Sequence, residues 1–501
     1  MSKTYTGTKK NIIFSYMNLF VSMLTGFLLL PFIVSSLGSS DYGLMQLVYS
    51  LTGYIGILDL GLGNAVIRFT ALYNTEEKKN KINTVATYSL IVYGTVAILG
   101  FIVGLFIFFN FGSYFNLTQN EVNKGKILFM IGLINALLQL PSMTFSAVIK
   151  GFNKYNYVYG TIVIKTILRA ILIAIMFNMG FGLITLFSID LITSQLLNLS
   201  WFIYNIRKLK LKFSLGQLDP EFKKEFGIYS FYVFLGVVTD LIYWKTDNIL
   251  LGIFTSTKDI AVYSISQQIV NYYKTIASGF TAAFLPKLTN MAFDKSSDNK
   301  LLSFFKRASK YQFIIVILIL INFIFLGRDF ITLWVGNNFI KAYKYTLIIM
   351  IPLSIPLFQT TGFQILYAKN KHKTRSVVYL INAILNILIS IYLINKIGVV
   401  GAAFGTAIAM TLGNIIFMNY YYKKELGLRI YSFFKDVCFK SSLLMIPTIF
   451  LLYYLNLLIA DISIINLIIK GLLANVPFVL LIYKYIIDEK DKESILVLRN
   501  R

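Results

Sequence analysis

Long apolar stretches separated by short polar gaps run through the whole chain. A stretch of about 20 apolar residues is long enough to cross the roughly 30 Å hydrocarbon core of a membrane as a helix. The chain contains fourteen such stretches. The pattern therefore predicts an all-α polytopic membrane protein with about 14 transmembrane helices. The predicted spans are 12–34, 42–66, 84–111, 127–149, 157–178, 181–205, 227–254, 260–285, 311–335, 345–367, 375–395, 398–422, 437–459 and 463–486.

The Lys and Arg residues predict the orientation of these spans. Most of the 47 fall in every second gap. Short cytoplasmic loops retain cations, because moving Lys or Arg across the membrane is unfavourable. We therefore expect a multi-pass protein of the cell (plasma) membrane with both the N and the C terminus in the cytoplasm. The opposite gaps hold only Lys124, Lys126, Lys258, Arg328, Lys341, Lys344 and Lys396.

The second half of the chain repeats features of the first at a nearly constant spacing. Lys154 and Lys371, each at the start of a predicted hairpin, are 217 residues apart. Gly180 and Gly398, in the turns of those hairpins, are 218 apart. This spacing predicts two pseudo-symmetric six-helix bundles in parallel orientation, with a cavity between them. The expected division is 1–210 and 211–425 for the bundles, and 426–501 for two extra transmembrane helices and a cytoplasmic tail.

Several kinds of chemistry are missing from the sequence. Cys438 is the only cysteine and His372 the only histidine, which argues against disulfides, metal sites and Cys/His or Ser/His/Asp catalysis. No Gly-rich phosphate loop is present. The net charge of +25 is spread over short loops, so it does not indicate nucleic acid. We therefore expect a transporter, with no enzymatic activity, no cofactor and no metal.

Several ordered segments resemble one group of transporters. They are LGSSDYGL at 37–44, LDLGLGNAVIR at 58–68, DNILLG at 247–252, VYS at 262–264 and IGVVGAAFGT at 397–406. In order and spacing the chain resembles the Wzx group of polysaccharide flippases in the multidrug/oligosaccharidyl-lipid/polysaccharide (MOP) superfamily. The lipid II flippase MurJ and the MATE drug antiporters are more distant relatives.

The resemblance implies a V-shaped pair of helix bundles that acts by alternating access. The substrate it implies is an undecaprenyl-pyrophosphate-linked oligosaccharide, carried to the outer leaflet for O-antigen, capsule or exopolysaccharide synthesis. Membrane lipids and, in addition, a polysaccharide polymerase and assembly proteins are the partners that it implies. It also implies a cationic lumen, so cations are expected inside the membrane.

Charged residues at membrane depth are costly and therefore mark candidate sites. Lys165 and Arg169 are four residues apart and share a helix face. Arg169 and Asp190 are expected at one depth, where they can form an ion pair, which leaves Lys165 as the best candidate for contact with pyrophosphate. The full set of candidate substrate-binding residues is Arg68, Lys165, Arg169, Lys245 and Lys274.

The intramembrane acids have two interpretations, ion coupling or structural pairing. The set is Asp59, Asp190, Asp240 and Asp247. Asp240 is expected near the depth of Lys274. Lys470, near the outer end of its span, is expected to extend its ammonium group toward the surface.

Two other functions stay open at this point. In a cation-coupled MATE-type drug antiporter, Asp59, Asp240 or Asp247 would bind the ion and a cationic drug, although the surplus of intramembrane cations argues against it. A glycan polymerase or ligase is the enzyme alternative. The short external loops argue against that class.

Overall fold

The computed structural model describes residues 2–74, 79–214, 220–282, 298–369 and 371–485. Nearly all of these residues are helical, and they include no β-strand, as the all-α prediction requires. The chain divides into two units, Met1–Ser264 and Ile265–Arg501, called here the N-terminal and C-terminal units. The expected bundle boundaries at 210 and 425 stay predictions.

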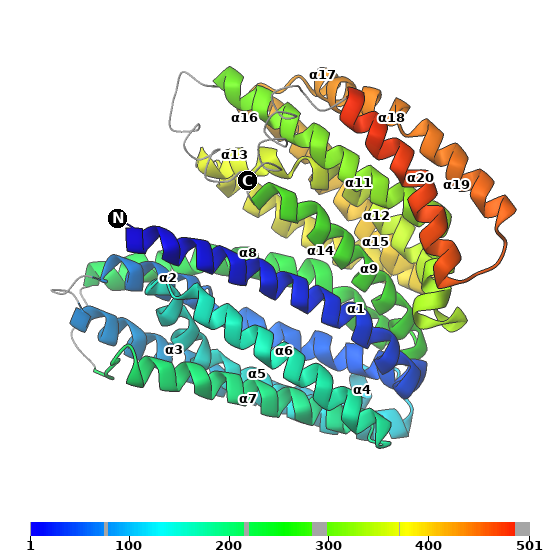
Figure 1. The fold of residues 1–501 in the computed structure, drawn as a ribbon. Coiled ribbons are helices and arrows are strands. Elements are labelled where there is room, and N and C mark those ends of the chain that lie inside the picture. The colour runs from blue at the N-terminus through cyan, green and yellow to red at the C-terminus, as the bar shows by residue number, and fades with distance from the viewer. Residues whose placement is uncertain (1, 75–78, 215–219, 283–297, 370, 486–501) are drawn as a thin grey trace. The chain divides into compact units, whose positions relative to one another are not determined.

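The N-terminal unit is a bundle of long helices (Figure 1). Within it α5 packs against α6 and α7, and α1 packs against α5 and α6. Its helices are α1 (Ser2–Gly53), α2 (Leu62–Leu72), α3 (Lys79–Phe109), α4 (Phe111–Tyr114), α5 (Gln119–Gly151), α6 (Tyr155–Asn178), α7 (Leu183–Arg207) and α8 (Pro220–Phe254), and α9 (Thr257–Ala282) begins in it.

Two backbone breaks shape the start of this unit. Gly38 has φ 74° and ψ 173° and kinks α1 between the first two predicted spans. A 3-10 turn, Tyr54–Asp59, then ends α1, and Leu60 and Gly61 follow with φ of 50° and 70°. These left-handed conformations interrupt the second predicted span at membrane depth. Such irregular backbone is tolerated there only inside protein or beside a cavity.

In the described part of the C-terminal unit, the rest of α9 is followed by ten further helices. Its π-helical segment Thr411–Phe417 joins α15 to α16. The helices are α11 (Asp298–Val335), α12 (Ala342–Phe358), α13 (Thr360–Ala368), α14 (His372–Ile397), α15 (Val399–Met410), α16 (Met418–Leu426), α17 (Ile430–Phe434), α18 (Lys440–Leu443), α19 (Ile446–Leu458) and α20 (Ile464–Tyr485).

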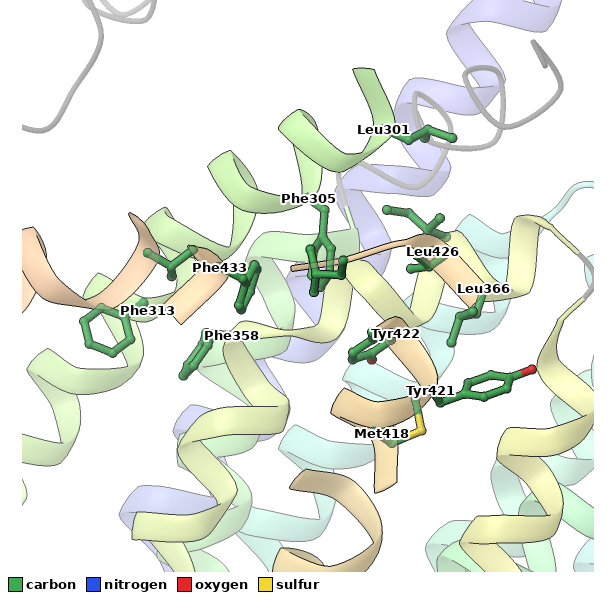
Figure 2. Packing of buried hydrophobic residues seen from close by; sticks show 13 residues of the cluster. Leu301, Phe305, Phe313, Phe358, Leu366, Met418, Tyr421, Tyr422, Leu426 and Phe433 are labelled. Carbon is green, nitrogen blue, oxygen red and sulfur yellow. The ribbon is translucent and has the colours of Figure 1, made fainter. Parts of the chain in front are cut away.

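Aromatic side chains form a core at one end of the C-terminal unit. Figure 2 shows Phe305 of α11, Phe358 of α12, Tyr422 of α16 and Phe433 of α17 turned toward one another. The rings of Phe305 and Phe433 have centroids 5.0 Å apart. Because these residues come from four helices, the cluster fixes the ends of those helices against one another.

Nine helices in the described residues are long and apolar enough to cross a membrane, or up to eleven if each bent helix pair is one span. Helix α1 counts once in this total, although it covers the first predicted span and part of the second. Large apolar side chains face outward, among them Ile98, Phe106 and Phe450. A multi-pass membrane protein is thereby confirmed, while the count of fourteen and the cytoplasmic termini stay predictions.

Candidate substrate-binding site

A cavity of about 460 Å³ lies inside the N-terminal unit, among α2, α5, α6, α7 and the 3-10 turn before α2. We call it the cationic cavity, because three of its lining side chains are Lys150, Lys165 and Arg169. Asp59 is the one carboxylate among the described residues that line it. The lining also includes Asn64, Gln139, Ser146, Thr166, Ser194, Asn198 and Trp201.

Lys165 and Arg169 reach the cavity from the same face of α6, as the four-residue spacing predicts. Lys165 is half-buried, and within the described residues its ammonium group makes no hydrogen bond or salt bridge. It is attracted only at longer range by Asp190, while Arg169 repels it. A half-buried cation without a direct protein partner can accept an anionic ligand with little loss of existing contacts.

Arg169 forms the ion pair with Asp190 of α7 that the sequence predicts. Its Nε donates to Asp190 Oδ1, and its Nη2 donates to Asp190 Oδ2 at 3.2 Å. The hydroxyl of Tyr49 on α1 also donates to Asp190 Oδ2. Arg169 is therefore already neutralised and held in place, so Lys165 is the more available of the two cations.

Asp59 lies at the helix break, where the backbone places its carboxylate on the cavity wall. Its Oδ1 accepts a hydrogen bond from the Tyr93 hydroxyl of α3 and one from the Gly63 backbone N–H at 3.4 Å. Lys150, at the last turn of α5, is close enough for its charge to attract that of Asp59. The cavity therefore combines one partly satisfied carboxylate with an excess of positive charge.

The other predicted site residues lie elsewhere. Arg68 is exposed on α2, with its guanidinium 5.5 Å from the Phe69 ring centroid. Lys245 is half-buried on α8, and Lys274 of α9 belongs to the C-terminal unit. Asp247 is buried and accepts a hydrogen bond from Tyr263 at 2.5 Å. None of these four lines the cationic cavity as the described residues define it.

Two expectations about charge pairs have different outcomes. Asp240 lies in α8, but its side chain is outside the described residues, so the pairing with Lys274 stays a prediction. The expectation for Lys470 is wrong. Its side chain is buried, and its Nζ lies 3.6 Å from Asp329 Oδ2.

Sequence reasoning missed Lys150 and Gln139 as cavity residues. The predicted span 127–149 leaves Lys150 in the gap that follows it, but α5 continues to Gly151 and carries Lys150 on the cavity face. The available signal was the spacing on α5. Gln139, Ser146 and Lys150 recur at intervals of seven and four, which places all three on one face of a helix.

The arrangement favours an anionic, polar ligand. Two lysines and a guanidinium supply charge-assisted donors, and amide and hydroxyl groups supply neutral ones. A low-dielectric membrane interior strengthens their attraction for phosphate oxygens. In the described residues, no group of three or more His, Cys, Asp or Glu side chains could hold a metal ion.

Comparison with known proteins defines the class to which this fold and site belong. The profile of the family described as "Polysaccharide biosynthesis protein" matches residues 8–292, which is more than half of the chain. The chain therefore belongs to the polysaccharide biosynthesis protein family. A putative O-antigen transporter of Shigella flexneri is 21% identical over 399 residues, covering 77% of this chain and 91% of that protein.

Solved structures share the fold across most of the chain. The lipid II flippase MurJ in an inward closed conformation superposes with a TM-score of 0.72 at 18% identity, covering 94% of this chain and 99% of that one. A multidrug resistance MATE family transporter of the MOP superfamily, in an inward-facing conformation, gives a TM-score of 0.67 at 16% identity, covering 83% and 98%. The predicted resemblance is thus confirmed. The protein is a plasma-membrane transporter of the MOP fold rather than an enzyme.

Proposed function

We propose that this protein moves an undecaprenyl-pyrophosphate-linked oligosaccharide repeat unit across the plasma membrane by alternating access, for the synthesis of a surface polysaccharide such as O antigen, capsule or exopolysaccharide. Membership of the polysaccharide biosynthesis family supports the class of substrate. The relatives described as an O-antigen transporter and a lipid II flippase support a lipid-linked saccharide.

The observation that carries the proposal is the cationic cavity. A pyrophosphate is too highly charged to cross a hydrocarbon core unaided, because the desolvation of each charge is unfavourable. Lys165 and Lys150 both line the cavity and offer ammonium groups to it, and Arg169 adds a guanidinium held by Asp190. We expect the diphosphate to bind there and to neutralise both lysines.

Depletion of the protein tests the proposal directly. In cells that keep the enzymes of glycan assembly, loss of the flippase should leave the lipid-linked saccharide in the cytoplasmic leaflet and remove the surface polymer. The lipid would be measured by mass spectrometry, and its leaflet by access of an added glycosidase to intact cells. Normal polymer together with an unchanged lipid pool would exclude this function.

Charge reversal at Lys165 tests the site. Lys165→Glu should reduce surface polymer at least tenfold, since it places a carboxylate against the diphosphate, whereas Lys165→Arg should retain most activity. Polymer would be quantified in complemented deletion cells, with protein level measured by immunoblot. Lys396→Glu, an equal charge change at an exposed residue of α14, is the matched control and should leave polymer normal. Full activity of Lys165→Glu would remove Lys165 from the site.

Drug export is the alternative, and the same deletion strain distinguishes it. A MATE-type antiporter would leave the polymer intact and raise sensitivity to cationic drugs on deletion. The positive lining of the cationic cavity disfavours a cationic ligand. We therefore expect unchanged drug sensitivity in the deletion strain.

A further inference from the structure

A second, smaller pocket adjoins the cationic cavity. It has a volume of about 210 Å³ and lies among α1, α5 and α7. The two spaces share Gln139, and the ion pair stands between them, because Arg169 lines the first and Asp190 the second. We call the second space the amide pocket. Its lining is Tyr49, Thr52, Gly53, Gly132, Asn135, Ala136, Gln139, Phe187 and Asp190.

The amide pocket offers neutral polar groups rather than cations. Asn135 and Gln139 are one turn apart on the same face of α5. Asn135 Oδ1 accepts from Gln195 Nε2 at 3.2 Å, and no described residue accepts from Asn135 Nδ2. The Gln139 amide makes no hydrogen bond to any described residue. Both side chains are half-buried, so their unpaired amide groups are accessible to a ligand or to water.

One wall of the pocket is aromatic and rigid. The Tyr49 and Phe187 rings are stacked, with centroids 4.7 Å apart and planes 17° apart. The Tyr49 hydroxyl is fixed by Asp190, whose charge Arg169 neutralises. Amide groups beside an aromatic wall match a sugar ring, which carries hydroxyl groups around its edge and C–H bonds on its faces. A phosphate group would fit the amide pocket less well, because its lining offers no uncompensated cation.

We propose that the amide pocket is the subsite for the sugar bonded directly to the diphosphate, with Asn135 and Gln139 as the residues that recognise its hydroxyl or acetamido groups. This inference rests on the proposed function. In a glycosyl diphosphate the first sugar is bonded directly to a phosphate. The amide pocket likewise adjoins the cationic cavity, so a diphosphate bound in the cavity would place its first sugar in the pocket. Gln139, which lines both, contacts the sugar near the linkage.

Binding measurements on the purified full-length protein in lipid nanodiscs test the subsite. The two probes are bare undecaprenyl pyrophosphate and the saccharide lipid extracted from cells depleted of this protein. Wild-type protein should bind the saccharide lipid about tenfold more tightly than the bare lipid, as one or two added hydrogen bonds allow. In Gln139→Leu this preference should fall to nearly one.

A second variant distinguishes loss of the sugar subsite from a general effect of Gln139→Leu on folding. An added Cβ at Gly53, which lines the amide pocket, meets no atom within 4 Å, so the backbone there has room for a side chain, and Gly53→Leu adds bulk at the pocket wall. It should abolish the same preference. Asn123→Leu removes an exposed amide near the start of α5 and should behave as wild type.

The outcomes separate this inference from the proposed function. Retention of the preference in both Gln139→Leu and Gly53→Leu, or its absence in wild type, would overturn the sugar subsite and leave the diphosphate site standing. Failure of wild-type protein to bind either lipid, or binding of bare lipid that Lys165→Glu does not weaken, would instead count against the proposed function.

Discussion

Lys470 of α20 and Asp329 of α11 illustrate how this protein holds a charge inside its apolar helices. Lys470 is 3% exposed, and its Nζ lies 3.6 Å from Asp329 Oδ2. Sequence position alone favoured an ammonium group extended toward the surface. The structure pairs it inside the C-terminal unit, because burial without a partner would be far more costly.

Removal of one partner should therefore be destabilising. We expect Lys470→Met to lower the free energy of unfolding by on the order of 3 kcal/mol, since it leaves the Asp329 carboxylate without its counter-ion. The double variant Lys470→Met/Asp329→Asn should recover most of the loss. Thermal unfolding of the detergent-solubilised protein measures both. If the double variant is no more stable than the single one, the pair is not the source of the effect.

At the scale of elements, α1, α5 and the start of α9 meet around Glu121. The Glu121 carboxylate accepts hydrogen bonds from Ser40 at 2.7 Å and Thr257 at 2.6 Å. It also completes a capping box with Thr118 at the start of α5. At Gly43 the backbone of α1 approaches that of α9 so closely that an added Cβ would lie 1.8 Å from the Thr257 carbonyl oxygen.

Gly43 is therefore expected to tolerate no side chain. Gly43→Ala should destabilise the protein by about 1–3 kcal/mol, because the backbone atoms in contact must separate. Gly94→Ala in α3 is the matched control, since its Cβ would meet nothing within 4 Å, and alanine is the better helix former. Apparent melting temperatures of the two variants give the comparison. Equal melting temperatures would show that α1 and α9 can separate at Gly43 without a loss of stability.

At the scale of the whole molecule, the alternation of basic and non-basic gaps predicts cytoplasmic termini. Cysteine labelling in intact cells tests this orientation in a Cys438→Ser background, which has no other thiol. Ser113→Cys, at an exposed position of α4, should react with a membrane-impermeant maleimide added outside. Ser214→Cys, exposed in the segment after α7, should react only after the cells are opened. The reverse labelling pattern would show that the orientation in the membrane is opposite to the predicted one.

The class of this protein follows from its amino-acid sequence alone. Its apolar lengths and the distribution of cations are set by the thickness and electrostatics of the membrane, which act on each segment separately. For the same reason Lys165 and the Arg169–Asp190 pair were predictable, since helix spacing and depth place them.

Which polar groups share a cavity becomes clear only from the packing of the helices. That depends on the rotation of each helix about its own axis and on backbone breaks such as Leu60 and Gly61, which packing fixes. Lys150 and Gln139 thus join Lys165 and Arg169, while Arg68 is exposed and lies outside the cavity lining. Side-chain direction follows from contacts between helices that are distant in sequence, and a single segment does not contain that information.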